Sequence, residues 1–328
     1  MKQMRSDLKA FERADTYFAL RSAELKRARD GRNYLALALY DRSGQINGYV
    51  WDRPEETADL LRGRSFAYVQ GLAKTHNGAI ILSIARVRPA GEEEVDINDF
   101  QEVVPGGVDL WMEKLHEQVT LVGDGSCRAL LEAFLSDDSF AEAFKMSPAG
   151  LTVHHNYIGG LVEHTSNTIS HAMHMSGKYP GILDRDLLVT GSFLHDIGKL
   201  KELSGGMTRG YTTEGRLLGH VSMGLLMVES RLQILKGFPA DLALLLKHMV
   251  LSHHGSLEFG SPVRPSTPEA LALHHIENTD AKMNHLYVHL KDSDPEKEWG
   301  PYDPFLGTSV YQRKFLKTMI AQRKEAEI

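Results

Sequence analysis

The chain has 328 residues, 42% of them hydrophobic, and a formal net charge of −6, which suffices for a well-buried core and predicts two or three domains. Its single cysteine, Cys127, excludes an intramolecular disulfide and a cysteine-based zinc finger and is typical of a reducing compartment. No apolar run approaches the ~18 residues that a membrane span needs, and the N-terminus has no signal-peptide core, so we expect a soluble, cytoplasmic protein.

The charge is unevenly distributed along the chain. Residues 1–90 contain 16 Lys and Arg against 10 Asp and Glu, whereas residues 91–328 contain 21 against 33. A basic first third suits a polyanionic partner. Charge alone does not separate this interpretation from a chance asymmetry.

The segment 13–88 has the pattern of short strands with tight turns. Apolar alternation and β-branched or aromatic residues mark the strand candidates, which are residues 34–40, 45–51, 66–72 and 80–87. A turn is predicted at 41–44 and a hairpin at Asn77-Gly78, and a short helix fits residues 55–61. Four or five strands with one small helix predict a small β-barrel of the OB type over residues 1–90.

After an acidic break at 91–95 the apolar periodicity becomes helical. We expect an acidic linker and helical connector over 91–145 and an all-α bundle over 146–292. The helix candidates are residues 109–122, 126–135, 139–145, 156–178, 184–195, 217–235, 240–252 and 268–291. Thr267-Pro268 predicts an N-cap with a first-turn proline, and Gly198 and Gly255 are expected to end helices.

The remaining segments are expected to be irregular. Residues 204–213 and 258–266 are predicted to be loops. Residues 292–307 contain three prolines and are predicted to wrap the surface, within a C-terminal tail, 293–328, that packs on the helical bundle.

Imidazole and carboxylate groups, the ligands that borderline and hard divalent cations prefer, recur in scattered helical segments. The candidates are His164, the adjacent pair His195-Asp196, His220, the adjacent pair His253-His254, and Asp280. A His-Asp pair lets two neighbouring side chains reach one point, with Asp196 free to bridge two metals. A paired-metal site is typical of in-line displacement at phosphorus.

Each candidate also has a structural interpretation. His195 and Asp196 could form a plain hydrogen bond, and Asp280 alone would be an ordinary solvated carboxylate. His164 and His220 could be core or surface histidines. Adjacent helical residues point about 100° apart, so both His253 and His254 can bind only if the backbone turns, as Gly255 permits.

Other residues near the candidate ligands are expected to assist. His155, at the entry to the helix that holds His164, is a candidate substrate contact, and Glu163 is a candidate acceptor for a ligand imidazole. The sequence has neither a Gly-x-Ser-x-Gly elbow nor a nucleotide-binding phosphate loop. It therefore indicates neither serine hydrolase nor NTP-driven chemistry.

These motifs resemble a known superfamily and, within it, one family. His164, His195-Asp196 and Asp280 resemble the HD phosphohydrolases, all-helical metal enzymes that hydrolyse phosphoesters. The sequence around and between these residues is similar to that of the YhaM-type 3′–5′ exoribonucleases, which join an N-terminal OB domain to a C-terminal HD domain. The matching segments are Gly159-Gly-Leu-Val-Glu-His164, Leu194-His-Asp-Ile-Gly-Lys-Leu200, Tyr211-Thr-Thr-Glu-Gly-Arg-Leu-Leu-Gly-His220 and Ser252-His-His-Gly255.

The resemblance implies a ligand set and a metal. One ion would be held by His164, His195, Asp196 and Asp280, and the second by Asp196, His220 and one or both of His253 and His254. It implies manganese, whereas the ligand set alone equally allows iron or zinc.

The expected reaction is hydrolysis of single-stranded RNA, and by extension single-stranded DNA, from the 3′ end to nucleoside 5′-monophosphates. The two ions would share Asp196 and activate a hydroxide between them. Lys199 and Arg264 are expected to neutralise a non-bridging phosphate oxygen. Lys199 could instead be a cation at a helix C-terminus.

The basic barrel is expected to bind the strand, because such barrels combine a cationic groove with aromatic stacking platforms. The aromatic candidates are Tyr34, Tyr49, Trp51 and Tyr68, and the backbone-contact candidates are Arg32, Arg42 and Arg53. For each of them an ordinary core or surface role is the alternative.

Two other functions compete with this one. The first is a phosphodiesterase or phosphohydrolase acting on cyclic or linear dinucleotides or on nucleotides, against which the strand-binding barrel argues. The second is a non-catalytic protein that binds single-stranded nucleic acid, against which the complete set of ligand positions argues.

Overall fold

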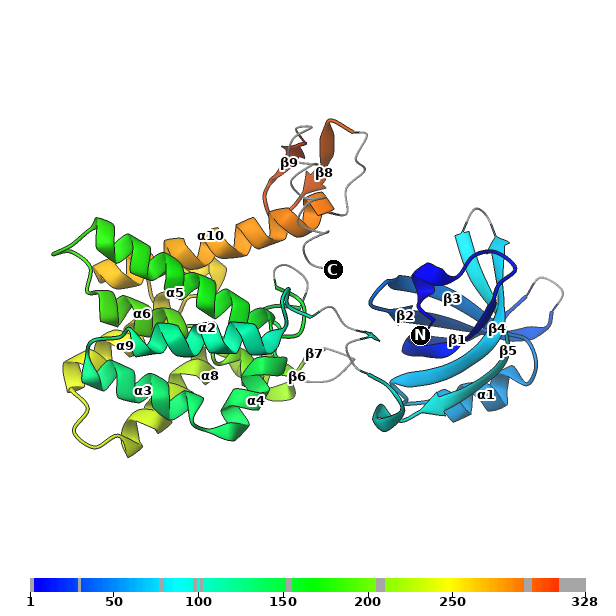
Figure 1. Cartoon of the computed structure of the whole chain (residues 1–328), viewed down its shortest axis with the longest axis horizontal. Coiled ribbons are helices and arrows are strands. Elements are labelled where there is room, and N and C mark those ends of the chain that lie inside the picture. Colours follow the sequence, from blue (N-terminus) through cyan, green and yellow to red (C-terminus); the bar gives the residue numbers. More distant parts are fainter. Residues whose placement is uncertain are drawn as a thin grey trace. The chain divides into compact units, whose positions relative to one another are not determined.

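The computed structural model describes residues 3–28, 31–76, 79–96, 99–100, 103–151, 155–204, 210–291 and 297–312. The chain divides into two compact units. The first unit is Met1–Glu102 with Gly206–Thr208, and the second is Val103–Gly205 with Arg209–Ile328 (Figure 1).

The first unit is a closed five-stranded barrel, which confirms the OB-like fold. Its strands are β1 (Arg13–Arg27), β2 (Asn33–Asp41), β3 (Gly44–Val50), β4 (Phe66–His76) and β5 (Ala79–Ala90). They close in the order β1-β2-β3-β5-β4, and only the β3–β5 pair among them is parallel. The helix α1 (Pro54–Leu61) joins β3 to β4. The predicted Asn77-Gly78 hairpin lies outside the described residues.

Alternating side chains build the barrel core. In β2, Leu35, Leu37 and Leu39 are 0–1% exposed, while the residues between them are only partly buried. This period of two is what places one face of a strand inside and the other outside. Phe18 of β1 and Leu82 of β5 complete the same apolar cluster.

The second unit is helical. Its helices are α2 (Val108–Thr120), α3 (Gly125–Leu135), α4 (Asp138–Met146), α5 (Gly160–Lys178), α6 (Arg185–Leu194), α7 (Lys199–Glu202), α8 (Thr213–Ile234), α9 (Ala240–Ser252) and α10 (Pro268–Lys291). Every residue of α6 from Leu187 to Leu194 is buried, because α6 packs against α3, α5, α9 and α10 (Figure 1). This central helix ends at the residue before His195.

Two helix starts differ from the prediction by four residues, whereas the other predicted starts agree to within one residue. The helix that holds His164 begins at Gly160, not at Asn156, because Gly159 is left-handed (φ 77°) and Ile158 pairs as an isolated bridge with Val103. The helix expected from Leu217 begins at Thr213, where the Thr212 hydroxyl accepts from the Gly215 amide.

Two segments predicted to be irregular contain short antiparallel pairs. β6 (Leu203–Ser204) pairs with β7 (Gly210–Tyr211), and β8 (Trp299–Asp303) pairs with β9 (Thr308–Tyr311). Asp303 of β8 lies 2.7 Å from His285 Nε2 of α10, so this part of the tail contacts the helical unit. Among the residues that the structure places, no helix combines the length and apolar character that a membrane crossing requires.

Candidate metal centre

The predicted ligands come from helix ends that meet inside the second unit. His195 and Asp196 follow α6, His253 follows α9, and His164 lies in the second turn of α5. These four side chains are 0–1% exposed. His220 lies in α8 directly after a kink at Gly219 (φ 70°), which turns the chain there.

A first group of atoms is spaced like the ligands of one cation. His164 Nε2 lies 3.1 Å from His195 Nε2, and Asp196 Oδ2 lies 3.5 and 3.4 Å from these two nitrogens. Imidazole binds a cation such as Zn²⁺ at ~2.0–2.1 Å, so two ligands of one ion lie roughly 3–3.5 Å apart. These three atoms could therefore hold one ion.

A second group faces the other oxygen of the same carboxylate. Asp196 Oδ1 lies 3.6 Å from both His220 Nε2 and His253 Nε2. His220 Nε2 is 3.0 Å from His254 Nε2, and the rings of His253 and His254 are 4.1 Å apart. Both adjacent histidines thus reach this group, and Asp196 lies between the two groups.

Unsatisfied buried atoms in this centre fit a cation. Asp196 Oδ1 and His253 Nε2 are buried and have no hydrogen-bond partner among the residues described. Leaving a buried polar group unpaired costs ~1–3 kcal/mol, more for a charged one. An ion between these atoms would remove that cost.

The outer ring nitrogens are anchored to acceptors. His195 Nδ1 lies 2.8 Å from the Ser192 carbonyl oxygen, and His253 Nδ1 lies 2.8 Å from that of Val250. Donation from Nδ1 leaves the Nε2 lone pair directed into the centre, as a metal-binding imidazole requires.

Charges inside the centre favour an ionised Asp196 and a neutral His254 ring. Burial alone would raise the pKa of Asp196, but the Lys199 ammonium, 2.6 Å from Oδ2, and the His195 ring hold this pKa well below its usual range. Burial and the nearby His220 ring lower the pKa of His254 to about 4. Histidine binds a metal in its neutral form.

Lys199 is not an exposed cation at a helix end. It begins α7, is 7% exposed, and pairs with Asp196. Arg264, by contrast, is exposed in the loop before α10, and its carbonyl accepts from the Ser266 hydroxyl. The structure therefore brings Lys199 to the centre and leaves Arg264 on the surface.

Asp280 meets His164 from the side away from the centre. Its Oδ2 lies 2.7 Å from His164 Nδ1, the ring nitrogen opposite the one that faces His195. The same oxygen lies 2.8 Å from His155 Nε2. This contact can orient the His164 ring, and the prediction that Asp280 itself holds an ion stays a prediction.

His155 is not placed to touch a substrate. It is 1% exposed, and its Nδ1 lies 2.7 Å from Glu163 Oε2. Glu163, His155, Asp280 and His164 thus form one buried chain of polar contacts. The neighbouring His154 lies outside the described residues.

Glu277 is a carboxylate near the centre that the sequence analysis did not single out. It lies one turn before Asp280 on α10, and burial together with the nearby Asp196 carboxylate raises its pKa to about 7. The signal in the sequence is the i, i+3 spacing of the two acids, which puts them on one helix face.

Gly198 does not end a helix, in contrast to the prediction. Its backbone is right-handed (φ −63°), and a Cβ there would lie 1.9 Å from the His220 carbonyl oxygen and 2.5 Å from the Gly224 nitrogen. Gly198 therefore permits the close approach of α7 to α8. Gly255 has φ 81°, as expected for a residue that turns the chain after α9.

In the barrel, three of the predicted aromatic residues gather. Tyr34 stacks on Trp51 with ring centroids 4.8 Å apart and lies 5.8 Å from Tyr49, and Arg32 lies over the Trp51 ring. Trp51 is 46% exposed. Tyr68 lies apart from them, on β4 beside Tyr17 of β1.

Arg42 and Arg53, the other two arginines predicted to contact the nucleic-acid backbone, are exposed. Arg53 precedes α1, and the Arg42 amide donates to the Asp99 carbonyl. Their side chains are thus accessible to a ligand on the barrel surface.

Comparison with known proteins identifies a domain family and several relatives of this chain. Residues 161–282 match the HD domain family. A protein of Bacillus velezensis described as 3′-5′ exoribonuclease YhaM is 36% identical over 273 residues, which covers 83% of this chain and 86% of that protein. Proteins of the same name from Bacillus subtilis and Bacillus licheniformis are 35% and 34% identical over 274 residues, with the same coverage.

Proposed function

Because this chain belongs to the family of YhaM 3′–5′ exoribonucleases, we propose that it is a metal-dependent enzyme that removes nucleoside 5′-monophosphates from the 3′ end of single-stranded RNA. The observation that carries the proposal is the shared carboxylate: the two oxygens of Asp196 face two separate groups of imidazoles. Two adjacent cation sites of this kind suit phosphodiester hydrolysis.

The distances around Asp196 divide the residues that would hold the ions into two groups. His164, His195 and Asp196 Oδ2 would hold one ion, and Asp196 Oδ1, His220, His253 and His254 the other. Glu277, on the α10 face that also presents Asp280, is a further candidate. We propose manganese for both sites; divalent ions bound there would lower the pKa of a coordinated water and stabilise charge on the phosphate.

The protein itself would fix the geometry. The Ser192 and Val250 carbonyls hold the His195 and His253 rings in one tautomer, and Asp280 holds His164. Lys199 balances the charge of Asp196 and would be a cation close to a phosphate seated at the centre. The buried setting keeps these charges unscreened.

The barrel would hold the strand that the helical unit cleaves. Stacking of a base on an exposed aromatic ring contributes ~1–3 kcal/mol and tolerates any sequence. The Tyr34–Trp51 stack with Arg32 above it has this character. Single-stranded DNA would bind the same platform, and a cytoplasmic location would supply the RNA.

Incubation of the full chain with Mn²⁺ and a 5′-labelled oligoribonucleotide tests the proposal. We expect a ladder of 3′-shortened products and release of nucleoside 5′-monophosphates. Retention of the strand without cleavage would indicate a binding protein. Cleavage of dinucleotides only would indicate a small-molecule phosphodiesterase.

A further inference from the structure

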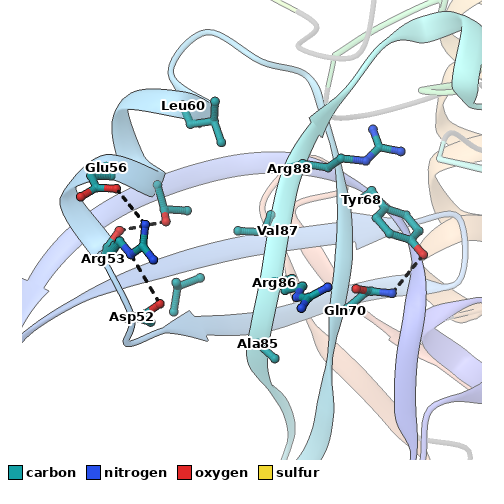
Figure 2. A pocket seen from close by; sticks show the side chains of 12 residues that line it. Asp52, Arg53, Glu56, Leu60, Tyr68, Gln70, Ala85, Arg86, Val87 and Arg88 are labelled. Carbon is teal, nitrogen blue, oxygen red and sulfur yellow. Dashed lines mark hydrogen bonds and ion pairs between the residues drawn. The ribbon is translucent and has the colours of Figure 1, made fainter.

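The barrel has a pocket whose lining includes Val50, Asp52 and Arg53, the chain neighbours of Trp51. Its volume is about 720 Å³, within the range of small-ligand sites, and residues of α1, β4 and β5 line it. In Figure 2 the Val87 side chain of β5 points toward α1, whereas Arg86 and Arg88 project from the other face of the same strand.

The pocket exists because the pairing between β3 and β5 is short. The parallel pairing of β3 with β5 ends at Val50–Ile84, whereas β5 continues to Ala90 beside β4. A bulge between the Gln70–Arg86 and Gly71–Ile84 pairs leaves Ala85 as the extra residue at this point. Bulges at barrel rims redirect side chains, and here the redirected strand opposes α1 across the pocket.

The pocket wall formed by β4 and β5 is cationic. Arg86 lies opposite Gln70 and Arg88 opposite Tyr68 in the β4–β5 ladder, so all four side chains share one face (Figure 2). Arg88 forms an ion pair with Glu94 at 2.7 Å, and its guanidinium lies over the Tyr68 ring. Within the described part of the chain, the Arg86 guanidinium has no acidic partner.

The opposite wall supplies a second cation and two carboxylates. Arg53, at the start of α1, is 70% exposed in its side chain and lies 3.8 Å from Asp52 and 3.7 Å from Glu56 (Figure 2). Exposed pairs at such distances contribute little and rearrange at small cost. The apolar side chains of Leu60 and Val87 lie between the walls.

We infer that this pocket binds the sugar-phosphate backbone of single-stranded RNA, with Arg86 as the main phosphate contact and Arg53 as the second. The planar guanidinium group matches a phosphate in two parallel hydrogen bonds. Arg86 is exposed and has no acidic partner among the residues that the structure describes, so it is available for them. Asp52 and Glu56 repel phosphate from the α1 side, which places it nearer to Arg86.

The inference rests on the proposed function and extends it. The segment 51–53 contributes Trp51 to the aromatic stack and Asp52 and Arg53 to the pocket. A strand whose base stacks on Trp51 therefore enters the pocket with its adjoining phosphates.

The test compares Arg86→Gln and Arg86→Lys with Arg64→Gln in the full chain. Arg64 is an exposed arginine of the same barrel that does not line the pocket. Affinity for a labelled oligouridylate is measured in EDTA over a series of salt concentrations. The rate on a small chromogenic phosphodiester with Mn²⁺, and the thermal melting temperature, are controls.

Loss of one phosphate contact from a single strand lowers the slope of log affinity against log salt by about 0.7 and weakens binding about fivefold at 0.1 M salt. We expect this for Arg86→Gln and not for Arg64→Gln, with the small-substrate rate unchanged in both. Arg86→Lys keeps the charge, so its slope should stay near that of the unmodified protein.

An Arg86→Gln protein that matches Arg64→Gln in slope and affinity would overturn the inference while strand cleavage by the unmodified chain still supports the proposed function. Titration with uridine 5′-monophosphate tests whether the pocket binds a free mononucleotide instead of a strand. Saturable binding of the mononucleotide that Arg86→Gln abolishes, with strand affinity unchanged, would also overturn it.

Discussion

At the scale of single residues, Asp196 joins the two halves of the centre. Its oxygens lie within 3.6 Å of four imidazole nitrogens, and Lys199 holds it in place. The alternative of a simple pair between Asp196 and His195 does not explain why Oδ1 is buried without a hydrogen bond in the described structure.

Asp196→Asn should lower RNA hydrolysis by more than roughly a hundredfold, because the amide keeps the shape but removes the charge on which both cation sites depend. The rate with Mn²⁺ and the bound manganese content both report on the change. Asp241→Asn, an exposed acid in the first turn of α9, is the matched control. Activity within a few-fold of the unmodified chain would show that Asp196 does not bridge.

His254 should make the stability of the metal-free protein sensitive to acid. Its pKa is lowered from 6.5 to about 4 by burial, so between these values the unfolded chain binds more protons than the folded one. The free energy of unfolding should therefore fall as the pH drops through this window, by at most roughly 3 kcal/mol from this residue.

Urea unfolding in EDTA at pH 7.5 and 5.0 measures this loss. His254→Gln should lose less stability than the unmodified chain over the same interval, and His116→Gln, at an exposed position of α2, should behave like the unmodified chain. Equal losses in all three proteins would contradict the assignment.

At the scale of secondary-structure elements, the contact between α7 and α8 sets the distance from Asp196 to His220. The two backbones meet at Gly198 and Gly224, where a side chain at Gly198 would overlap the His220 carbonyl. Because Asp196 precedes α7 and His220 belongs to α8, this crossing brings opposite sides of the second cation site together.

Gly198→Ala should therefore destabilise the protein by roughly 1–3 kcal/mol, the usual cost of overpacking, and weaken manganese binding. Gly177→Ala is the control, since Gly177 is exposed near the end of α5 and a Cβ there meets nothing within 4 Å. It should be neutral or slightly stabilising, as alanine favours helix. Similar effects of the two changes on thermal unfolding and manganese titration would show that the close contact of α7 with α8 does not cause the loss.

At the scale of the whole molecule, the two units have separate apolar cores. The barrel core includes Phe18 and Leu37, and the helical core includes Phe134 and Phe193. Each unit thus buries its own apolar surface, which is the main source of folding free energy. The division also separates the proposed strand-binding surface from the proposed catalytic centre.

Removal of residues 1–102 should leave hydrolysis of a small phosphodiester intact and weaken binding of long oligoribonucleotides. The salt dependence of binding should fall as well, because the basic barrel supplies the phosphate contacts. Affinity measured at several salt concentrations for the full and shortened chains gives both values. An unchanged salt slope would mean that the barrel does not bind the strand.

Much of the architecture could be predicted from the sequence. The period of two at Leu35, Leu37 and Leu39 specified a strand with one buried face, and the apolar run ending at Leu194 specified a buried helix that delivers His195 to the interior. These inferences succeed because local geometry alone fixes which side chains share a face.

Only the tertiary structure decided which faces meet. Sequence periodicity places Asp280 and Glu277 on one side of α10, but the packing of α10 against α5 set Asp280 against the outer nitrogen of His164. In the same way, residue 198 is a glycine because α8 approaches it closely, and not because the chain reverses there. His155 is buried beside Glu163 and is therefore removed from solvent. Contacts between distant segments depend on how whole helices pack, and the residues of one segment do not encode that alone.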